Sequence, residues 1–375
     1  MCLKIRSIEL ERFRAFRALQ IKGLGRVNLI TGKNNTGKSS ILEALRILTS
    51  DAAPSVIMSI LRYREEDVDD VEDESRTVDM DSLFLVSTLF NGFPQLSESP
   101  EPIFISTSDG TKPMKLKLGV AWLSEERDAE GNRRLVAQQA DLFGEAEGSA
   151  ALTIEAEGGK RAMRFEQFRR YPYRGRMLRP ESTDEPRMPC VFVSPYGGER
   201  TATLGALWDR IALSDQEKDV VDALKIIDPQ ISAVSMVGGE SPRRSRTAIV
   251  RADNIARPVP LRSFGDGLNR LFGIILSLVN AKDGLLLIDE FENGMHHSVQ
   301  LDAWRAVFRL AQKLNIQVFA TSHSWDSIEA FQKASAETPE DGVLIRLARK
   351  GDDVIPTVFA EDELAVATRD GIEVR

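Results

Sequence analysis

Cysteine is scarce in this sequence: the 375 residues contain only two, Cys2 and Cys190. Two cysteines exclude a disulfide-stabilised scaffold and provide no metal-ligand spacing, and so low a content is typical of a reducing cytosol. Long apolar runs are also missing. The longest ones, 271–279 and 285–288, are far shorter than the ~20 residues of a membrane-spanning helix. Charges are interleaved throughout residues 1–16, which therefore lack the apolar core of a signal peptide. We expect a cytoplasmic protein that does not enter a membrane.

Basic residues are not in excess either. The formal net charge is −8, which argues against a surface coated with cations for nucleic acid, although local basic patches are compatible with it. The content of 42% hydrophobic and 28% charged residues is typical of a soluble protein with a substantial core, and it excludes general disorder. No long heptad pattern is present, which excludes a coiled-coil arm.

A glycine-rich segment follows an apolar strand pattern near the N-terminus. Residues 32–39, the glycine loop, read GKNNTGKS and match the pattern G-x-x-x-x-G-K-[ST], with an apolar helix pattern directly after them. Glycines at both fixed positions let the backbone turn its N–H groups onto phosphates at a helix N-terminus. Lys38 is placed to reach the β- and γ-phosphates, and the Ser39 hydroxyl is a ligand for Mg2+. This context favours a nucleotide site over a chance match. The expected nucleotide-binding residues of this segment are Gly32, Lys33, Asn34, Asn35, Thr36, Gly37, Lys38, Ser39 and Ser40.

A second apolar strand pattern ends in two carboxylates. Residues 285–288 are followed directly by Asp289 and Glu290. Beside a glycine loop, an aspartate at such a strand end holds Mg2+ opposite the loop hydroxyl, and the next carboxylate can act as a general base on the attacking water. An ordinary strand-to-loop transition has the same pattern, so the interpretation depends on the glycine loop. We expect Asp289 and Ser39 to bind Mg2+ and Glu290 to be catalytic, together with Lys38.

The next apolar strand pattern, 316–320, leads into Thr321, Ser322 and His323. The sequence has only three histidines. His323 follows the strand that we expect beside the strand that ends in Asp289 and Glu290. We therefore expect His323 to act as a γ-phosphate sensor. The other two, His296 and His297, are adjacent and cannot face one site from a helix, which disfavours metal binding.

A third segment precedes the acidic strand and resembles a known family. Residues 263–270, the signature segment, read SFGDGLNR and open an apolar helix pattern. The order of glycine loop, signature segment, acidic strand and Thr-Ser-His resembles the ABC-type ATPases. The closest likeness is to their soluble branch, which contains the overcoming-lysogenisation-defect (OLD) proteins and the RecF-like and SMC-like proteins. The N-terminal IRSIELERFRAF and the later IDEFENGMHH also resemble that branch. The likeness covers 2–48 and 190–330 well and the middle of the chain poorly.

The resemblance implies a mechanism in which two protomers sandwich two ATP molecules with Mg2+. Each signature segment then touches the γ-phosphate that the opposite glycine loop holds. By position, the resemblance implies phosphate contacts in trans from Ser263, Gly265, Asp266 and Gly267, a phosphate contact from Arg12, a general base in Glu290 and a switch in His323. The expected partner is a second copy of the chain, in a homodimer or higher oligomer.

The alternation of strands and helices predicts an α/β fold of the P-loop NTPase class with a mostly parallel sheet. We expect an ABC-type head with an antiparallel β insertion and a helical subdomain. The alternating segments 103–106, 116–122, 135–138 and 152–155 predict the antiparallel strands, and the apolar pattern over 203–226 predicts helix. Four parts follow: residues 1–50, the N-terminal part of the ATPase core; 51–189, a divergent insertion with an acidic loop and antiparallel strands; 190–260, a helical and β subdomain; and 261–375, the C-terminal part of the core with the signature segment, the acidic strand and the switch histidine.

Two biological functions remain open at this point. OLD proteins carry a C-terminal Toprim nuclease domain, but only about fifty residues follow His323, too few for an independent nuclease domain. The resemblance then favours an ATPase that regulates a separately encoded effector, such as a Toprim-like nuclease, in antiphage defence. The alternative is a DNA-binding ATPase of repair or maintenance. It is favoured by the arginine-rich stretches 160–179 and 243–246, which could track phosphates and stack bases. The same stretches also fit a solvated face or an ion-pair patch against the acidic run 65–74 of another subunit.

Overall fold

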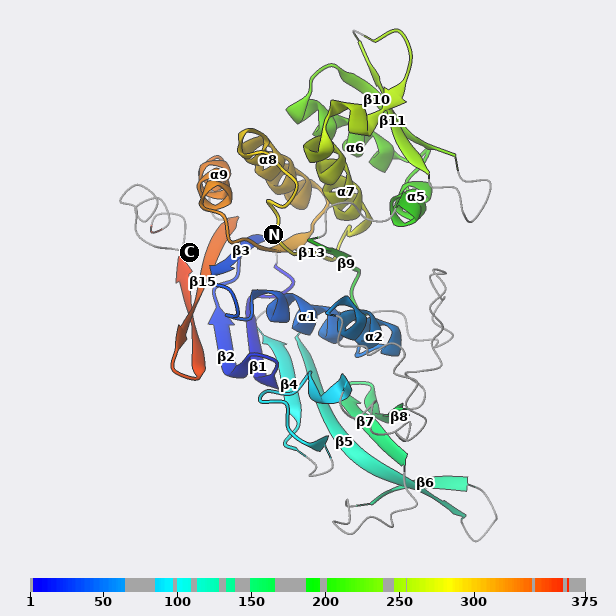
Figure 1. Ribbon diagram of the computed structural model, residues 1–375, viewed down its shortest axis with the longest axis vertical. Coiled ribbons are helices and arrows are strands. Elements are labelled where there is room, and N and C mark those ends of the chain that lie inside the picture. Colours follow the sequence, from blue (N-terminus) through cyan, green and yellow to red (C-terminus); the bar gives the residue numbers. More distant parts are fainter. Residues whose placement is uncertain are drawn as a thin grey trace, which may run out of the picture.

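Two large β-sheets, one mostly parallel and one antiparallel, organise the fold (Figure 1). The computed structural model describes residues 3–64, 85–96, 100–108, 113–127, 133–138, 149–165, 187–195, 201–238, 246–253, 255–338, 341–359 and 363. No helix in these ranges is long and apolar enough to cross a membrane.

The mostly parallel sheet has the strand order β16-β15-β3-β14-β13-β9. Its neighbours are parallel except for β15 and β16. Because helices or the second sheet cover both faces, β3, β13 and β14 are buried along their whole length, without the alternation of a half-exposed strand. The predicted α/β fold with a mostly parallel sheet is confirmed. The strands are β3 (Val27–Gly32), β9 (Cys190–Val193), β13 (Leu285–Ile288), β14 (Gln317–Thr321), β15 (Gly342–Lys350) and β16 (Asp353–Phe359).

The antiparallel sheet combines the N-terminal hairpin with the strands that were predicted as an insertion. Its order is β2-β1-β4-β5-β7-β8, and β6 pairs with β5. The antiparallel strands expected between 103 and 155 are therefore confirmed, and they continue the sheet that β1 and β2 begin. The strands are β1 (Ser7–Phe13), β2 (Phe16–Lys22), β4 (Ile103–Ser108), β5 (Met114–Arg127), β6 (Arg133–Gln138), β7 (Ser149–Ala156) and β8 (Gly159–Arg164). A smaller antiparallel sheet contains β10 (Ile231–Val237), β11 (Thr247–Ala252) and β12 (Val259–Pro260).

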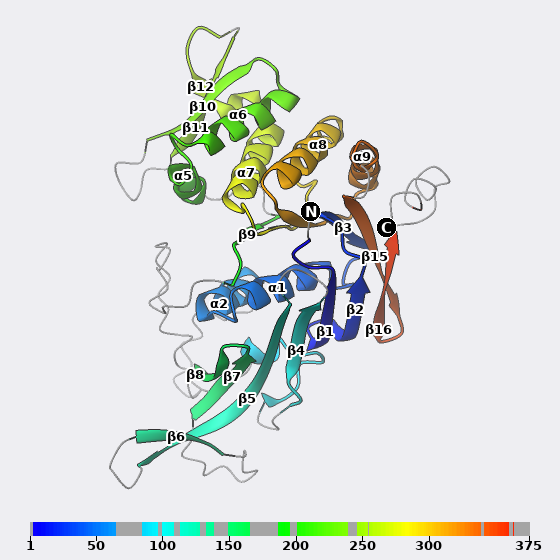
Figure 2. The same ribbon diagram turned by 180° about the vertical axis from the view of Figure 1, so that it is seen from behind.

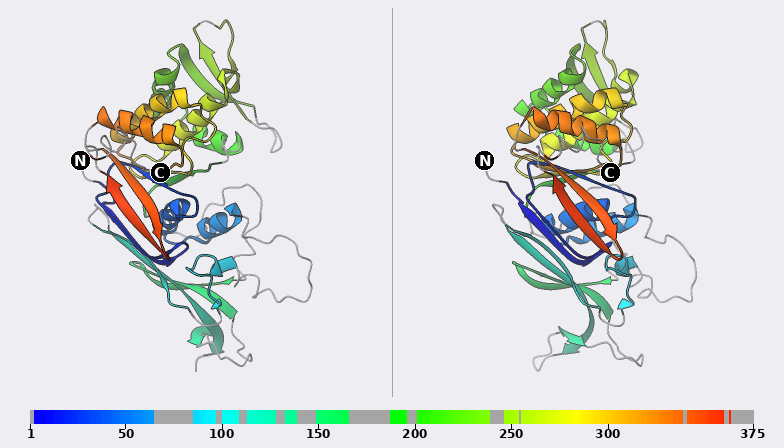
Figure 3. Two further views of the ribbon diagram at one scale, coloured as in Figure 1. Left: turned by 60° about the vertical axis from the view of Figure 1, so that its left-hand side comes forward. Right: turned by 90° about the vertical axis from the view of Figure 1, so that its left-hand side faces the viewer.

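Helices form two layers on opposite faces of the parallel sheet. α1 and α2 lie between the two large sheets, and α7, α8 and α9 cover the other face, as Figures 1 and 2 show. The same layers are visible from the side in Figure 3, where the helices of the second layer lie above the strands. Two buried apolar clusters correspond to these layers, because alternate side chains of β3 and β13 enter one cluster or the other. The helices are α1 (Lys38–Thr49), α2 (Pro54–Tyr63), α5 (Thr201–Asp209), α6 (Asp215–Ile227), α7 (Asp266–Asn280), α8 (His297–Lys313) and α9 (Trp325–Ala336), and the 3-10 helix η2 spans Leu261–Phe264.

The helical prediction for 203–226 is refined by the structure. The chain forms the two helices α5 and α6 in this range, with a turn between them. Ser214 ends the turn as the N-cap of α6, where its side chain accepts a hydrogen bond from the Gln216 N–H. The acidic residues Asp215 and Glu217 in the first turn of α6 favour a new helix start there. The four-part division of the chain stays a prediction.

The start of β13 gives a test of the fold. Gly284 precedes β13 where that strand meets β9, and a Cβ on Gly284 would lie 2.0 Å from the carbonyl oxygen of Pro189. That oxygen accepts the Leu285 N–H, so it cannot move without opening the β9–β13 pairing. We expect Gly284→Ala to lower the free energy of unfolding in urea by about 2 to 3 kcal/mol. Gly158→Ala is the control, because a Cβ there has no heavy atom within 4 Å, and it should change stability by less than about 0.5 kcal/mol. Equal effects of the two substitutions would contradict this account of the strand pairing.

Candidate functional site

The glycine loop joins the end of β3 to the start of α1. Gly32 (φ 143°) and Gly37 (φ 88°) adopt backbone angles that L side chains rarely adopt. A Cβ on Gly37 would lie 2.5 Å from the Phe16 ring, and one on Gly32 would lie 2.5 Å from the Leu347 carbonyl oxygen. Both conformation and space therefore require glycine at the two fixed positions. Gly37 is also the N-cap of α1, and no side chain caps this helix, so its first N–H groups point toward whatever anion the loop receives.

The remaining loop residues differ in exposure. Lys33, Asn34 and Asn35 are exposed, whereas Thr36 and Ser40 are buried. The Thr36 hydroxyl donates to the Lys33 carbonyl oxygen over 2.8 Å, which closes the loop on itself. The exposed residues therefore form its outer rim and the buried ones hold its shape.

Lys38 folds back over the loop. Its ammonium group donates to the carbonyl oxygens of Gly32 at 2.6 Å and Lys33 at 3.1 Å. Burial lowers the pKa of Lys38, and the carboxylates of Asp289, Glu290 and Glu292 oppose this shift. The lysine thus lies in the field of the acidic turn after β13, which the sequence had placed in the same site.

A chain of hydrogen bonds connects the ends of β3, β13 and β14. The Ser39 hydroxyl lies 3.0 Å from Oδ1 of Asp289, and the Thr321 hydroxyl donates to the same oxygen at 2.6 Å. Asp289 and Thr321 are buried. The parallel pairing of β3, β14 and β13 brings the three residues together, because the carboxyl ends of parallel strands meet at one edge of the sheet. The predicted pairing of Ser39 with Asp289 is present in this geometry.

Glu290 follows Asp289 in an unusual backbone conformation. Its φ of 50° is in the left-handed region, which costs a non-glycine residue of order 1–3 kcal/mol. The Glu290 N–H donates to the Thr321 hydroxyl at 2.8 Å. The Asn293 amide binds the Pro195 carbonyl oxygen at 2.6 Å and lies 3.4 Å from Oε2 of Glu290. The half-exposed carboxylate is therefore turned out of the strand direction and is held on a short, bonded turn.

His323 lies beside a buried acid. Its ring atom Nδ1 is 3.1 Å from Oε1 of Glu292, and its side chain is 54% exposed whereas that of Glu292 is 8% exposed. The backbone N–H groups of His323 and Ser324 donate to the same oxygen at 2.9 and 3.2 Å. The turn after β13 and the turn after β14 are therefore joined by one carboxylate.

The signature segment forms a different part of the surface. It covers η2 and the start of α7, where Ser263 and Asp266 are exposed and Gly265 (φ 106°) is the N-cap, without a side-chain cap. The Asp266 carboxylate pairs with Arg262 at 3.0 Å. A Cβ on Gly267 would lie 3.7 Å from the Gly294 carbonyl oxygen, so the segment lies close to the turn before α8.

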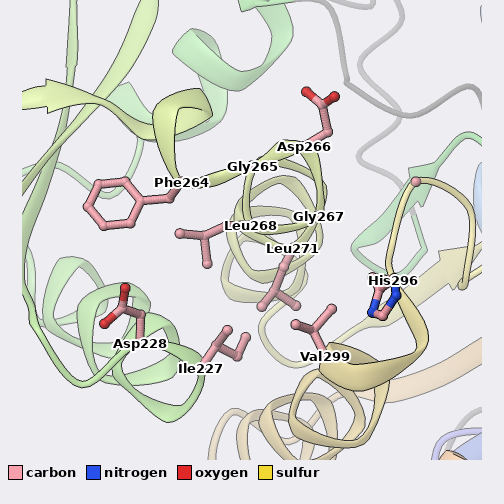
Figure 4. Close-up of a pocket in the computed structure, with 11 residues that line it drawn as sticks. Ile227, Asp228, Phe264, Gly265, Asp266, Gly267, Leu268, Leu271, His296 and Val299 are labelled. Carbon is pink, nitrogen blue, oxygen red and sulfur yellow. The ribbon is translucent and has the colours of Figure 1, made fainter.

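A pocket of about 420 Å³ lies beneath the signature segment. It is bounded by the end of α6, the start of α7 and the start of α8, with Ile227, Leu271 and Val299 on its apolar floor, while Asp266 points away from it (Figure 4). The residues that line it are Ile227, Asp228, Phe264, Gly265, Asp266, Gly267, Leu268, Leu271, Gly294, His296 and Val299. The glycine loop is not among them, so the structure does not unite the two predicted segments in this pocket.

Arg12 is bound to neighbours of its own. Its Nε donates to the Pro102 carbonyl oxygen at 2.8 Å, its guanidinium pairs with Glu11 at 2.9 Å and Glu101 at 3.2 Å, and it lies over the Phe104 ring. These contacts hold it at the junction of β1 and β4, and its predicted phosphate contact stays a prediction.

Three residues of this region were missed as site residues: Thr321, Glu292 and Asn293. Thr321 ends β14 and bonds to Asp289 and to the Glu290 N–H. Glu292 and Asn293 lie on the turn after β13, where Glu292 accepts the His323 N–H and Asn293 lies beside the Glu290 carboxylate. Their place in the sequence could have identified them, because polar residues at the ends of two neighbouring buried strands meet at one edge of the sheet.

The chain is similar to known family models and proteins. Residues 3–126 match the family model "AAA ATPase domain", and residues 200–328 match "AAA domain, putative AbiEii toxin, Type IV TA system". A protein of Helicobacter pylori described as "ATP/GTP phosphatase" is 23% identical over 376 residues, which span 96% of each chain. "Uncharacterized protein MJECL10" of Methanocaldococcus jannaschii is 46% identical over 59 residues, 16% of this chain and 27% of that protein.

A solved structure shows the same fold. It is described as "Crystal structure of the SmcHead bound to the C-winged helix domain of ScpA", and it matches with a TM-score of 0.51 at 10% identity, covering 96% of this chain and 99% of that one. The chain therefore has the fold of an SMC or ABC-type ATPase head, and its sequence matches models of AAA-family ATPase domains.

The Thr321 hydroxyl gives a test of the bond network at the strand ends. Thr321→Val keeps the shape of the side chain but leaves the buried Asp289 without one donor and the Glu290 N–H without its acceptor. We expect the free energy of unfolding in urea to fall by about 1 to 3 kcal/mol. Thr49→Val is the matched control, since that buried hydroxyl donates to the Leu45 carbonyl oxygen of its own helix and should cost much less. Equal losses for the two variants would mean that the network adds nothing beyond burial.

Proposed function

We propose that this chain binds ATP and Mg2+ at the glycine loop and hydrolyses the nucleotide to ADP and phosphate. One observation carries the proposal: the Ser39 hydroxyl lies 3.0 Å from Oδ1 of Asp289, although 250 positions separate the two in the sequence. A glycine loop alone is a sequence pattern. A loop hydroxyl placed against the carboxylate at the end of an adjacent buried strand is the arrangement that a magnesium nucleotide needs.

The glycine loop provides the phosphate contacts in this proposal. The N–H groups of the loop and of the first turn of α1 receive the phosphate oxygens, and Lys38 exchanges its bonds to the Gly32 and Lys33 carbonyl oxygens for bonds to the β- and γ-phosphates. Burial already disfavours the charged form of Lys38. The negative charge of a polyphosphate at this position compensates for the hydration that the ammonium group loses on burial.

The residues present fit a magnesium ion. The Ser39 hydroxyl and the Asp289 carboxylate supply two oxygen ligands at one point. This is the pattern of Mg2+, which keeps several waters and takes one or two protein oxygens besides the phosphates. When bound, the ion stabilises the negative charge that develops on the transferred phosphoryl group.

Glu290 is the proposed general base. A water oxygen attacks the γ-phosphorus, the bond from that phosphorus to the β–γ bridging oxygen breaks, and the Glu290 carboxylate accepts the proton of the water. The left-handed backbone of Glu290 and its contacts with Thr321 and Asn293 favour this role, because they aim the carboxylate away from the strand. His323, on the neighbouring turn, contacts the γ-phosphate side of the nucleotide.

The signature segment completes the site from a second copy of the chain. Its residues line a pocket that does not include the glycine loop of the same chain. Gly265 caps α7 without a side chain, and Ser263 and Asp266 are exposed, so this helix start can receive a phosphate that another copy holds. This geometry and the resemblance to ABC-type ATPases support the proposal of a nucleotide-dependent dimer in which Ser263, Gly265, Asp266 and Gly267 act in trans.

The comparisons support ATP hydrolysis, and the biological role of that hydrolysis is our proposal. The Helicobacter pylori relative is described as an ATP/GTP phosphatase, and the chain lacks the Asn-Lys-x-Asp pattern of guanine-specific switches, so ATP is the proposed substrate. The match of residues 200–328 to a family described by AbiEii and toxin–antitoxin systems supports a role in defence. We propose that the ATPase, whose motifs resemble those of the OLD branch, regulates a separately encoded effector.

The DNA-binding alternative gains no support from the described residues. Most of the stretch 160–179 and all but Arg246 of 243–246 lie outside them, as does the acidic run 65–74. Of the described members, Lys160 pairs with Glu155, Arg161 with Asp51 and Arg246 with Asp209. DNA binding stays a prediction from the sequence.

Replacing the general base tests both hydrolysis and the dimer. Glu290→Gln keeps the shape of the side chain but removes the proton acceptor, so we expect kcat for ATP to fall about 10²- to 10⁴-fold with ATP binding retained. With ATP and Mg2+, light scattering should show twice the monomer mass for the variant. Without nucleotide, the same sample should show the monomer mass. Glu329→Gln, which removes an exposed carboxylate on α9, is the control. A variant that hydrolyses ATP at the wild-type rate excludes Glu290 as the base, and an ATP-bound monomer excludes the sandwich.

Lys38 should control nucleotide affinity. Lys38→Ala removes charge-assisted bonds to two phosphates, and we expect the Kd for ATP, measured by isothermal calorimetry with Mg2+, to rise about 10- to 100-fold. Lys282→Ala, at an exposed lysine beyond α7, should leave the Kd unchanged. Unaltered affinity in Lys38→Ala would place the nucleotide somewhere other than the glycine loop.

A further inference from the structure

Glu292 is a buried carboxylate without a role in the reaction described above. It lies on the turn after β13, three positions beyond Asp289, and its side chain is 8% exposed. Among the described residues its second oxygen, Oε2, is buried without a hydrogen-bond partner. An unpaired buried carboxylate oxygen destabilises a fold, so stability alone does not explain an acid at this position.

The other oxygen of Glu292 makes three contacts, all with the turn after β14. Oε1 accepts the backbone N–H groups of His323 at 2.9 Å and Ser324 at 3.2 Å, and it lies 3.1 Å from the His323 ring atom Nδ1. One atom thus accepts the backbone N–H of His323 and lies beside the ring of the same residue. This fixes the position of the turn and the rotation of the imidazole together.

The turn that carries Glu292 is itself rigid. The Phe291 N–H donates to the Thr321 carbonyl oxygen at 3.0 Å, and the Phe291 ring stacks on Trp304 of α8 with centroids 3.7 Å apart. Both aromatic side chains are fully buried. Glu292 therefore holds His323 against a fixed part of the core and not against a mobile loop.

The chemistry of the contact defines the state of the ring. Oε1 already accepts two backbone N–H groups, so a ring nitrogen 3.1 Å away meets it favourably only as an N–H donor, and the geometry points to a proton on Nδ1. Nε2 is then the ring nitrogen that remains for the nucleotide or for the second copy, on a side chain that is 54% exposed. In a histidine without such a partner, the proton is not confined to Nδ1.

We propose that Glu292 is the positioning residue of the switch: it fixes the orientation and the tautomer of His323, so that Nε2 is presented to the γ-phosphate. The inference rests on the proposed ATP hydrolysis for its purpose, but the state of the ring is independent of any nucleotide. An experiment can therefore contradict the inferred state of the His323 ring without contradicting ATP hydrolysis, and the reverse.

The other histidines supply an internal reference. Nδ1 of His296 accepts the Ser298 N–H at 3.3 Å and lies 2.9 Å from the Ser298 hydroxyl, so its surroundings differ from the carboxylate contact of His323. With only three histidines in the chain, ring nitrogen spectra of histidine-labelled protein can be assigned by removing one at a time.

The first test is the tautomer of His323 in the full chain without nucleotide. At pH 8, long-range 1H–15N spectra of the wild-type protein should show a protonated Nδ1 for the signal that His323→Ala removes. In Glu292→Ala that signal should shift toward the mixed state of a solvated imidazole, whereas Glu292→Gln, whose amide oxygen can accept the same three N–H groups, should keep Nδ1 protonated. A wild-type His323 with an unprotonated Nδ1, or a spectrum unchanged in Glu292→Ala, overturns the inference.

The second test connects the geometry with turnover. We expect Glu292→Ala to lower kcat for ATP about 10- to 100-fold, the size of effect that partners of catalytic groups commonly have, with KM changed less than about threefold and with recovery in Glu292→Gln. Asp219→Asn is the matched control, since Asp219 is also 8% exposed and pairs with Lys313 away from this site. It should lose stability but keep kcat. A parallel loss of kcat in Asp219→Asn, or a normal kcat in Glu292→Ala, shows a structural role only. A wild-type protein that lacks ATPase activity but shows the expected tautomer refutes the proposed function and leaves the contact intact.

Discussion

The parallel pairing of β3, β14 and β13 is the constraint on which the candidate site depends. Each of these strands ends at the same edge of the sheet beside residues of a different kind: the glycine loop at β3, Thr321 and then His323 at β14, and Asp289 and Glu290 at β13. No local segment could assemble this set. The site exists because strands that are buried on both faces leave their polar continuations at one place, where helices no longer cover the backbone.

At that edge, a few buried polar atoms replace the regular bonds of the sheet. The Thr321 hydroxyl serves Asp289 and the backbone of Glu290 at once, and the Glu292 carboxylate serves the whole turn around His323. Such bonds are directional, and in a low-dielectric setting they hold side chains more firmly than apolar packing can. The packing beneath them, with Phe291 against Trp304, supplies a rigid base. The left-handed backbone conformation of Glu290 is then maintained by its contacts with Thr321 and Asn293.

The sequence predicted the structure best at residues that are required both for their chemistry and for their backbone conformation. The glycines of the loop are visible as a pattern because their φ angles and close neighbours admit no other residue, and the fully apolar strands identify a covered parallel sheet. The break between α5 and α6 was missed because apolar periodicity continues across it, while one serine cap decides the outcome. Arg12 was assigned a phosphate contact by its position in the family resemblance, which does not reveal its partners Glu101 and Pro102, some ninety positions away. Glu292 and Thr321 were missed for the same reason, since their importance depends on a neighbouring strand that local patterns do not reveal.

The order of the strands also has a consequence for how the chain acquires its structure during synthesis. β3 is complete within the first 32 residues, but both of its neighbours, β14 and β15, come after residue 316, and the buried Asn28 amide bonds to Val318 across 290 positions. Contacts over such separations form late, because the entropy of closing so long a loop must be overcome first. As the chain leaves the ribosome, β3 therefore waits unpaired while nearly all of the molecule is made. The glycine loop, fixed at its end, gains its final shape only when the last parallel strands arrive.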